Sequence, residues 1–356
     1  MSCPVGRLAP SPTGLLHLGH ARSFLLAWWS VRSRAGRLVL RMEDLDGERC
    51  RPEFADAILR DLEWLGLCWD GPVILQSEQA AAHQAALEKL RRAGLCYPCV
   101  CTRREIREAA SAPQAPPGAA SNSDPGAASA YPGTCRGRFK SGPEADAAND
   151  ANDADAAGAA GAANDANADD ADWAAGAASG RPVAWRLRVE PGAVSFSDGL
   201  YGAQSFDPGR EVGDFPIARR DGQAAYQLAV VVDDAAAGVT EVMRARDLLP
   251  STARQVLLLR HLGLAAPSWT HLPLVLDQHG QRLAKRSDAL SLQALREAGK
   301  TPGQIVAWAA ASAGLHGEDP QLAPDPADPK ARPSDYLATF RRATLTRGDV
   351  QAPSQF

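Results

Sequence analysis

Three short segments near the start of the chain differ in how their apolar positions are spaced. Residues 5–9 (VGRLA) have the pattern of a strand, and residues 37–46 (RLVLRMEDLD) form a second strand pattern that runs into acidic residues. Between them, residues 21–36 place apolar side chains on one helical face, and Gly36 stands where a helix would end. The residues of that face are Phe24, Leu25, Trp28 and Val31. The order predicts a β-α-β unit, which implies parallel strands joined by a right-handed crossover.

Two later segments have the spacing of helices. Residues 250–263 (PSTARQVLLLRHLG) predict one helix, with Thr252 and Gln255 spaced for a capping box at its start. Residues 301–314 (TPGQIVAWAAASAG) predict another. Two adjacent acidic residues that follow an apolar run are expected in a loop or as helix caps, namely Asp233 and Asp234.

Residues 141–180 differ in composition from the rest of the chain. They contain 18 alanines and nine acidic residues but no lysine or arginine, and they offer few apolar side chains large enough for a core. We expect this segment to be a disordered insertion, with residues 111–130 as a second, shorter one. Without the nine acidic residues, the formal net charge changes from −4 to +5, which is compatible with a polyanionic partner but does not require one.

The cysteine content and the N-terminus favour a cytoplasmic protein. Seven unevenly spaced cysteines argue against a disulfide framework and favour a reducing compartment. Neither a signal peptide nor an apolar stretch long enough to cross a bilayer is found in the sequence. We expect a cytoplasmic monomer.

Residues 9–22 (APSPTGLLHLGHAR) lie where the first strand ends and the first helix begins. A helix N-terminus at this edge of a parallel sheet presents unpaired N–H groups, which suit an anionic ligand. Gly14 and Gly19 allow the backbone to approach a ligand closely, and the imidazoles of His17 and His20 can donate hydrogen bonds to phosphate oxygens. The alternative is that the two histidines only cap the helix.

The tetrapeptide HLGH resembles the HIGH signature of class I aminoacyl-tRNA synthetases. Residues 7–22 and 40–54 (LRMEDLDGERCRPEF) further resemble the glutamyl branch of that class. Residues 282–286 (RLAKR) stand where this family carries its KMSKS signature; they depart from it at the first and third positions but retain the lysine, Lys285. The resemblance implies that ATP, with Mg²⁺, is bound and activated by His17, Gly19, His20 and Lys285.

An amino-acid pocket for glutamate must bind two carboxylates and one ammonium group. Arg7, in the first strand, is placed to bind a carboxylate, and Glu43, after the second strand, is placed to pair with the ammonium group. The resemblance implies further glutamate contacts at Ala9, Ser11, Tyr226 and Arg244. The alternatives are that Tyr226 is a core aromatic residue and that Glu43 is a solvated surface charge.

Three cysteines and one tyrosine supply a candidate metal site. Their order, Cys-x-Cys followed by Tyr-x-x-x-Cys, resembles the zinc-binding insertion of a paralogue family within the glutamyl branch. The implied Zn²⁺ ligands are Cys99, Cys101, Tyr131 and Cys135. The 29 residues between Cys101 and Tyr131 are an unusually long spacing, but a flexible insertion adds little closure entropy. The alternative is a set of thiols that binds no metal.

The expected fold is α/β, a Rossmann-type class I synthetase catalytic domain with an inserted zinc-binding, acceptor-like subdomain and without an anticodon-binding domain. We expect a first Rossmann half at 1–95, the inserted subdomain at 96–200, the second half with the signature loop at 201–314, and a short tail at 315–356.

The paralogue family transfers glutamate to the queuosine base in the anticodon of tRNA(Asp). The short tail and the cysteine and tyrosine order favour this family over full-length glutamyl-tRNA synthetases. The expected activity is therefore that of an ATP-dependent ligase with glutamate and queuosine-bearing tRNA(Asp) as substrates. Two alternatives stay open: a glutamyl-tRNA synthetase that charges tRNA(Glu), and a non-catalytic remnant that binds tRNA.

Overall fold

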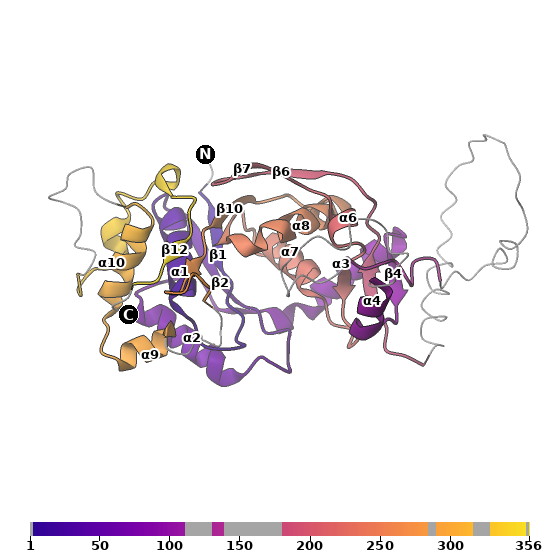
Figure 1. Cartoon of the computed structure of the whole chain (residues 1–356), viewed down its shortest axis with the longest axis horizontal. Helices are drawn as coiled ribbons and strands as arrows, with labels where there is room; N and C mark the ends of the chain where they lie inside the picture. Colours follow the sequence, from indigo (N-terminus) through magenta and orange to yellow (C-terminus); the bar gives the residue numbers. More distant parts are fainter. Residues whose placement is uncertain (1–2, 111–129, 139–179, 284–289, 316–327, 354–355) are drawn as a thin grey trace, which may run out of the picture.

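The computed structural model describes residues 3–110, 130–138, 180–283, 290–315, 328–353 and 356 (Figure 1). The expected disordered insertions and Lys285 lie outside the described residues, apart from the ends of the two insertions. In the part of the chain that is described, no helix is long and apolar enough to span a bilayer.

The predicted β-α-β unit is present at the start of the chain. Strands β1 (Val5–Leu8) and β2 (Arg37–Met42) pair in parallel around helix α1 (Leu18–Arg32), and β3 (Ile74–Leu75) extends the same sheet beside β2. Helix α1 begins three residues earlier than its apolar spacing predicted, because His17 caps it. Its end at Arg32 is also earlier than the predicted Gly36. His17 and His20 therefore belong to the N-terminal turn of the helix.

A second sheet continues the first. It has the strand order β7-β6-β10-β9, in which β9 (Glu241–Ala245) and β10 (Ser268–Leu272) are parallel. The outer strands β6 (Val194–Asp198) and β7 (Gly202–Phe206) form an antiparallel hairpin. At the junction, the Thr240 N–H donates to the Val5 carbonyl at 2.8 Å, so β9 lies beside β1. Two mutually packed helices lie beside this sheet (Figure 1): α7 (Tyr226–Ala236) and α8 (Leu249–Leu262).

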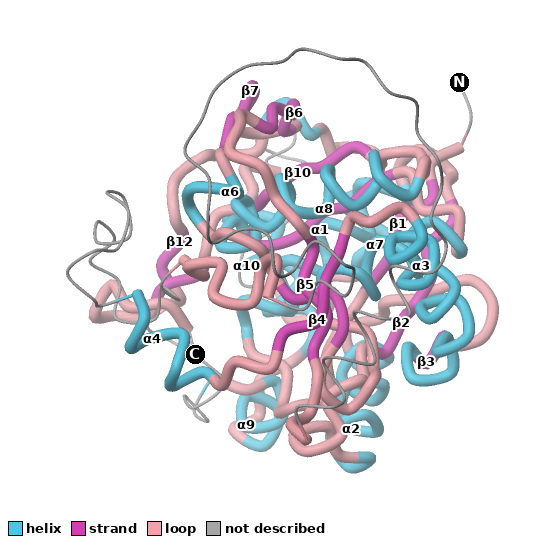
Figure 2. The backbone as a smooth tube through the Cα atoms, turned by 90° about the vertical axis from the view of Figure 1, so that its right-hand side faces the viewer, coloured by secondary structure: helices cyan, strands magenta, loops and turns pink. Residues whose placement is uncertain are grey.

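A third, antiparallel sheet lies at the opposite end of the molecule from the C-terminus (Figure 1). Its strands, in order, are β4 (Cys96–Cys99), β5 (Ala184–Leu187) and β8 (Pro216–Ala218), and β4 and β5 face the viewer in Figure 2. Helix α3 (Ala80–Arg92) precedes this sheet, and helix α4 (Arg103–Ala110) leaves it after the cysteine pair. The candidate metal ligands therefore lie in a part of the fold that is separate from the parallel sheets.

The C-terminal segment returns to the first helix and to the signature region. Strand β12 (Val350–Gln351) pairs in parallel with β11 (Val275–Leu276), and the Trp29 Nε1–H of α1 donates to the Pro333 carbonyl at 2.7 Å. The remaining elements are α2 (Pro52–Trp64), η1 (Gln76–Gln79), α6 (Pro208–Glu211), η2 (Arg246–Leu248), α9 (Leu292–Glu297), α10 (Pro302–Ser312), η4 (Pro333–Tyr336) and η5 (Arg342–Thr344).

Both later helices are present, but they differ in how the predicted N-terminus compares with the structure. Helix α10 has a capping box formed by Thr301 and Gln304 and agrees with the predicted helix at 301–314. Helix α8 is present, but the predicted capping box of Thr252 and Gln255 is wrong, because the helix begins at Leu249. The Thr252 hydroxyl instead accepts a hydrogen bond from a buried arginine of β9, described below.

Candidate functional site

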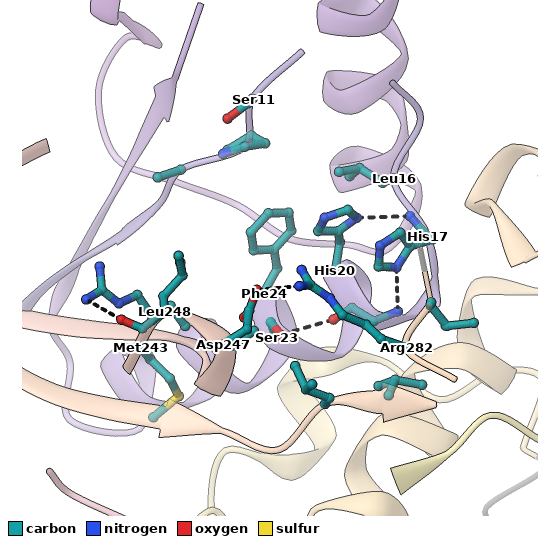
Figure 3. Close-up of a pocket in the computed structure, with 18 of the residues that line it drawn as sticks. Ser11, Leu16, His17, His20, Ser23, Phe24, Met243, Asp247, Leu248 and Arg282 are labelled. Atoms are coloured by element: carbon teal, nitrogen blue, oxygen red, sulfur yellow. Dashed lines mark hydrogen bonds and ion pairs between the residues drawn. The ribbon is translucent and has the colours of Figure 1, made fainter. Parts of the chain in front are cut away.

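One cavity of about 340 Å³ brings together distant parts of the chain (Figure 3). Its walls are the ends of β1 and β2, the first turns of α1 and α7, the end of β9 and the segment that enters and leaves β11. Nine predicted ATP and glutamate residues line it: Arg7, Ala9, Ser11, His17, Gly19, His20, Glu43, Tyr226 and Arg244. Arg282 and Leu283, just before the undescribed Lys285, line the same cavity.

The two histidines both cap the helix and line the cavity. The Gly19 N–H donates to His17 Nδ1 at 3.1 Å, and the His17 N–H donates to His20 Nδ1 at 3.2 Å. Their ring centroids lie 3.7 Å apart (Figure 3). A ring nitrogen that accepts a hydrogen bond carries no proton, so the donor that each neutral ring can offer to a ligand is Nε2–H. The capping interpretation and the ligand interpretation are therefore compatible.

Four charged residues form a buried network under the cavity. The Asp234 carboxylate contacts Arg41 Nη1 at 2.6 Å and Arg7 Nε at 3.3 Å. Arg41 Nη2 also contacts Glu43 Oε1 at 3.1 Å. Burial alone would raise the pKa of Asp234, but the neighbouring Arg41 and Arg7 outweigh it and hold that pKa below its usual range. A fifth charged group, the Asp233 carboxylate, lies 4.0 Å from Arg41 Nε. Glu43 and Arg7 remain on the cavity wall.

Asp233 and Asp234 were expected in a loop or as helix caps, and that prediction is wrong. Both lie inside α7 and are buried. Asp233 accepts from Gln76 Nε2 at 2.7 Å and lies 2.7 Å from His83 Nε2. The partners of the two aspartates come from elements about 150 residues or more away in sequence, so local spacing did not reveal them. The available signal was two carboxylates in an otherwise apolar helical run.

Arg244 is buried and lies on β9 at the cavity. Its Nη2 donates to the Thr252 hydroxyl at 2.8 Å, and its Nε donates to His271 Nε2 at 3.1 Å. Its Nη1 has no hydrogen-bond partner among the described residues. A buried guanidinium N–H without a partner is costly, so this atom is suited to a carboxylate ligand.

Tyr226 and Arg282 lie on two other walls of the cavity. Tyr226 is 38% exposed, so the alternative of a core aromatic residue is wrong. Arg282 Nη1 forms an ion pair with Asp247 at 2.7 Å (Figure 3), which attaches the start of the signature segment to the residues that follow β9.

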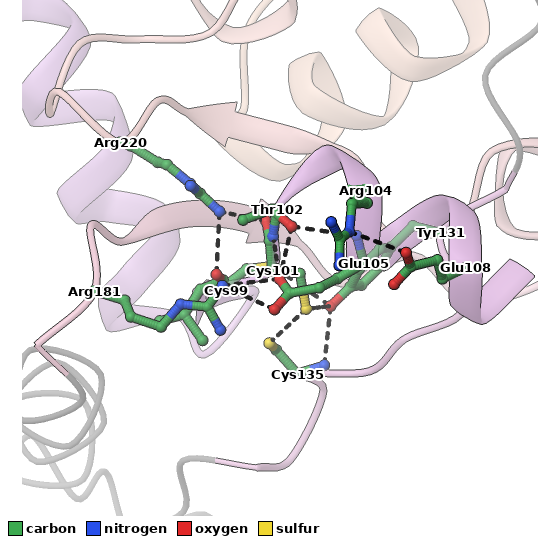
Figure 4. Close-up of polar contacts among 11 residues, drawn as sticks. Cys99, Cys101, Thr102, Arg104, Glu105, Glu108, Tyr131, Cys135, Arg181 and Arg220 are labelled. Atoms are coloured by element: carbon green, nitrogen blue, oxygen red, sulfur yellow. Dashed lines mark hydrogen bonds and ion pairs between the residues drawn. The ribbon is translucent and has the colours of Figure 1, made fainter.

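The predicted metal residues also lie together, outside this cavity (Figure 4). The Sγ atoms of Cys99, Cys101 and Cys135 all lie within 4.8 Å of one another. The Tyr131 hydroxyl lies 3.5 Å from Cys99 Sγ and 3.8 Å from Cys101 Sγ. Zn–S bonds of about 2.3 Å in a tetrahedron place sulfur atoms roughly 3.8 Å apart, so the four side chains fit a closed zinc site.

The thiols already differ in acidity. A shared hydrogen bond with Cys135 and burial together raise the pKa of Cys99 to about 12. The same hydrogen bond lowers the pKa of Cys135 to about 6. Arg186 Nε donates to Cys99 Sγ at 3.2 Å, and its guanidinium lies over the Tyr131 ring. A cation beside the cluster favours thiolates, which are the forms that bind Zn²⁺.

Comparisons with known proteins identify the family of this chain. The sequence family described as "tRNA synthetases class I (E and Q), catalytic domain" matches residues 5–136 and 153–313. The chain therefore belongs to the class I tRNA synthetases. A glutamate tRNA ligase from Elizabethkingia meningosepticum, solved in complex with its amino acid, has the same fold with a TM-score of 0.73 at 22% identity, covering 99% of this chain and 68% of the other.

Closer relatives define the branch. A glutamyl-Q tRNA(Asp) synthetase from Nocardia farcinica is 43% identical over 342 residues, which are 96% of this chain and 91% of the relative. One from Nitratidesulfovibrio vulgaris is 40% identical over 358 residues, covering 95% of this chain and 98% of the relative. Within its class, the chain belongs to the glutamyl-Q tRNA(Asp) synthetase family.

Proposed function

We propose that this protein activates glutamate with ATP and transfers the glutamyl group to the queuosine base of tRNA(Asp). The two relatives that match nearly the whole chain are named glutamyl-Q tRNA(Asp) synthetase. The single observation that carries the proposal is the cavity, in which a helix N-terminus with two imidazoles faces a buried arginine and a carboxylate. One wall suits phosphates, and the other suits an amino acid.

The first step joins the two substrates. A carboxylate oxygen of glutamate attacks the α-phosphorus of ATP, a new C–O–P bond forms, and the bond to the β-phosphate breaks to release pyrophosphate. The attacking carboxylate is already ionised, so no general base is needed. Catalysis then depends on positioning and on stabilising the charge at the transferred phosphoryl group.

The predicted site residues that line the cavity each have a role in this step. The Nε2–H groups of His17 and His20 donate to the phosphate oxygens, and Gly19 allows the helix N-terminus to approach them. Arg7 and the Nη1 of Arg244 bind the substrate carboxylates, and Glu43 pairs with the ammonium group. The remaining contacts to glutamate are Ala9, Ser11 and Tyr226.

Two roles extend beyond the described residues or require a metal. Lys285, which follows the cavity-lining Leu283 by two positions, binds the β- and γ-phosphates. Mg²⁺, when bound with ATP, neutralises phosphate charge. The zinc site would be formed by Cys99, Cys101, Tyr131 and Cys135. These residues do not line the cavity, so the role of Zn²⁺ there would be to stabilise the third sheet.

The test is to incubate the protein with ATP, labelled glutamate and tRNA from cells with and without queuosine. We expect label only on queuosine-bearing tRNA(Asp), at the anticodon. Label on the 3′ end of tRNA(Glu) would assign the activity to a charging synthetase. Absence of glutamate-dependent exchange between ATP and pyrophosphate would leave a binding protein without catalysis.

A further inference from the structure

Arg244 is held by a chain of buried side chains that lies behind the cavity. His271 is fully buried on β10, directly opposite Arg244 in the register of the parallel strands. Its Nε2 accepts from Arg244 Nε at 3.1 Å, and its Nδ1 lies 2.7 Å from Asp198 Oδ2. We call Asp198, His271 and Arg244 the relay; of these three residues, only Arg244 lines the cavity.

Asp198 is itself fixed at the end of β6. One of its oxygens accepts from the backbone N–H groups of Leu200 and Tyr201, each at 2.9 Å. The other accepts from the His271 backbone N–H at 3.0 Å. Burial alone would raise the pKa of Asp198, but these hydrogen bonds and the one from His271 Nδ1 hold it below its usual range. The carboxylate is therefore an ionised, immobile acceptor.

This arrangement determines which nitrogen of His271 carries the proton. The Asp198 carboxylate can only accept, so Nδ1 must be the donor, and in the neutral ring Nε2 is then a lone-pair acceptor. Burial lowers the pKa of His271, which favours the neutral ring. Only this tautomer can accept from Arg244 Nε, because a proton on Nε2 would face an N–H of the guanidinium.

The three nitrogens of Arg244 thus have separate tasks. Nε is held by His271, Nη2 is held by the Thr252 hydroxyl, and Nη1 has no partner among the described residues. A guanidinium is planar, so fixing two of its nitrogens fixes the third. The direction of Nη1 is therefore set by residues that do not reach the ligand.

We propose that Asp198 and His271 are positioning residues that orient Arg244 for the carboxylate of the amino-acid substrate. They act on amino-acid binding and not on ATP binding, because the phosphate wall of the cavity is built by α1. The identity of that substrate as glutamate rests on the proposed function, whereas the tautomer of His271 does not.

A matched pair of variants tests the proposal in the full-length chain. In His271→Gln, the side-chain oxygen can reach the position of Nε2 and accept from Arg244. In His271→Asn, the shorter amide can reach only the position of Nδ1, so the contact with Asp198 is kept and the contact with Arg244 is lost. Glutamate-dependent exchange between ATP and pyrophosphate gives the KM for glutamate and for ATP separately.

We expect His271→Asn to raise the KM for glutamate by about 10- to 100-fold, the range for a hydrogen bond to a charged group. The KM for ATP should change less than about twofold, and His271→Gln should recover most of the loss. A purely structural role would move both KM values or the melting temperature of both variants alike. An unchanged KM for glutamate in a folded His271→Asn variant would overturn the relay while leaving the proposed function intact.

A measurement on the wild-type protein decides the matter if both variants fail to fold. Nuclear magnetic resonance of ¹⁵N-labelled histidine should show His271 as a neutral ring with its proton on Nδ1. A proton on Nε2 would overturn the relay. Wild-type protein that shows this tautomer but no glutamate-dependent exchange would overturn the proposed function and keep the orienting role toward another ligand of Arg244.

Discussion

The backbone N–H of His17 donates to Nδ1 of His20 at 3.2 Å, across the first turn of α1. The contact uses the one ring nitrogen that does not serve as a donor to a ligand. Together with the bond from Gly19 to His17 Nδ1, it sets the tautomer of both rings before any ligand enters. The helix cap and the phosphate-binding groups are thus one structure, and suitable substitutions can separate their two effects.

His17→Asn should separate helix capping from phosphate binding. Asparagine places an oxygen near the position of Nδ1 and is a favourable N-cap residue, but it has no group at the position of Nε2. We expect a melting temperature close to that of the wild type and a loss of roughly 100-fold or more in the rate of pyrophosphate exchange, as for the loss of one transition-state donor. His17→Ala should lose both, with an added stability cost of about 1 kcal/mol for the missing cap. Wild-type exchange in the folded His17→Asn variant would contradict the catalytic role.

The spacing of residues along the chain predicted the local secondary structure around this site. It missed the contacts between residues that are far apart in sequence. The strand and the helix that follows it lie in one short continuous segment, so their pattern predicted both elements, although the helix begins three residues earlier than expected, with His17 as its cap. Asp233, by contrast, looked like a helix cap because its partners His83 and Gln76 are far away in sequence.

The error at Thr252 has the same cause. Its hydroxyl was expected to cap a helix but bonds to Arg244, which lies on a different element. No local pattern reports which side chain from another strand will reach a given hydroxyl. The cavity itself could be expected only through the family resemblance, because Arg7 and Arg244 are more than 200 residues apart.

Asp61→Asn should stabilise the protein in a pH-dependent way. Asp61 is buried on α2, and one of its oxygens lies 3.2 Å from Arg296 Nη1 while the other has no hydrogen-bond partner among the described residues. Burial raises its pKa from the ordinary value near 3.8 to about 6, despite the opposing effect of Arg296. The folded state therefore favours the neutral acid.

The sign of the effect follows from that raised pKa. The stability that the neutral acid provides is present below about pH 4 and is lost as the pH rises through about 6. Asparagine mimics the neutral acid at every pH. The stability difference in favour of Asp61→Asn should thus grow between pH 4 and pH 6.5 and level off at roughly 2–3 kcal/mol. Denaturant unfolding at a series of pH values measures it, and a difference that shrinks as the pH rises would contradict the burial argument.

Zinc should be present at about one ion per chain in protein purified without chelators. Elemental analysis measures it, and Cys135→Ser should lower the zinc content strongly because it removes one of three clustered thiols. Cys68→Ser is the matched control, since Cys68 is exposed and lies outside the cluster. The cluster does not line the cavity, so removing the metal should lower the melting temperature while leaving glutamate-dependent exchange largely intact. Full stability without zinc would disprove the structural role.

The C-terminal segment at 328–353 should affect ATP binding, although none of these residues lines the cavity. Asp349 accepts from the Leu274 N–H at 2.9 Å and from Arg246 Nη2 at 2.6 Å, and the next two residues pair with β11. Leu276 of β11 in turn bridges to Arg282, three positions before Lys285. Asp349 therefore holds the base of the signature segment from outside.

Asp349→Ala removes both contacts at that base. We expect a rise of about 5- to 30-fold in the KM for ATP, corresponding to the loss of one or two kcal/mol of positioning energy. The KM for glutamate should change less, because Arg244 is held by His271 and Thr252 instead. Asp335→Ala is the control, since Asp335 lies in the same C-terminal segment but bonds to the Arg332 N–H, away from β11. Equal KM values for ATP in the two variants would mean that the pairing of β12 with β11 has no effect on ATP binding. The start of the signature segment would then be held by the ion pair of Arg282 with Asp247 alone.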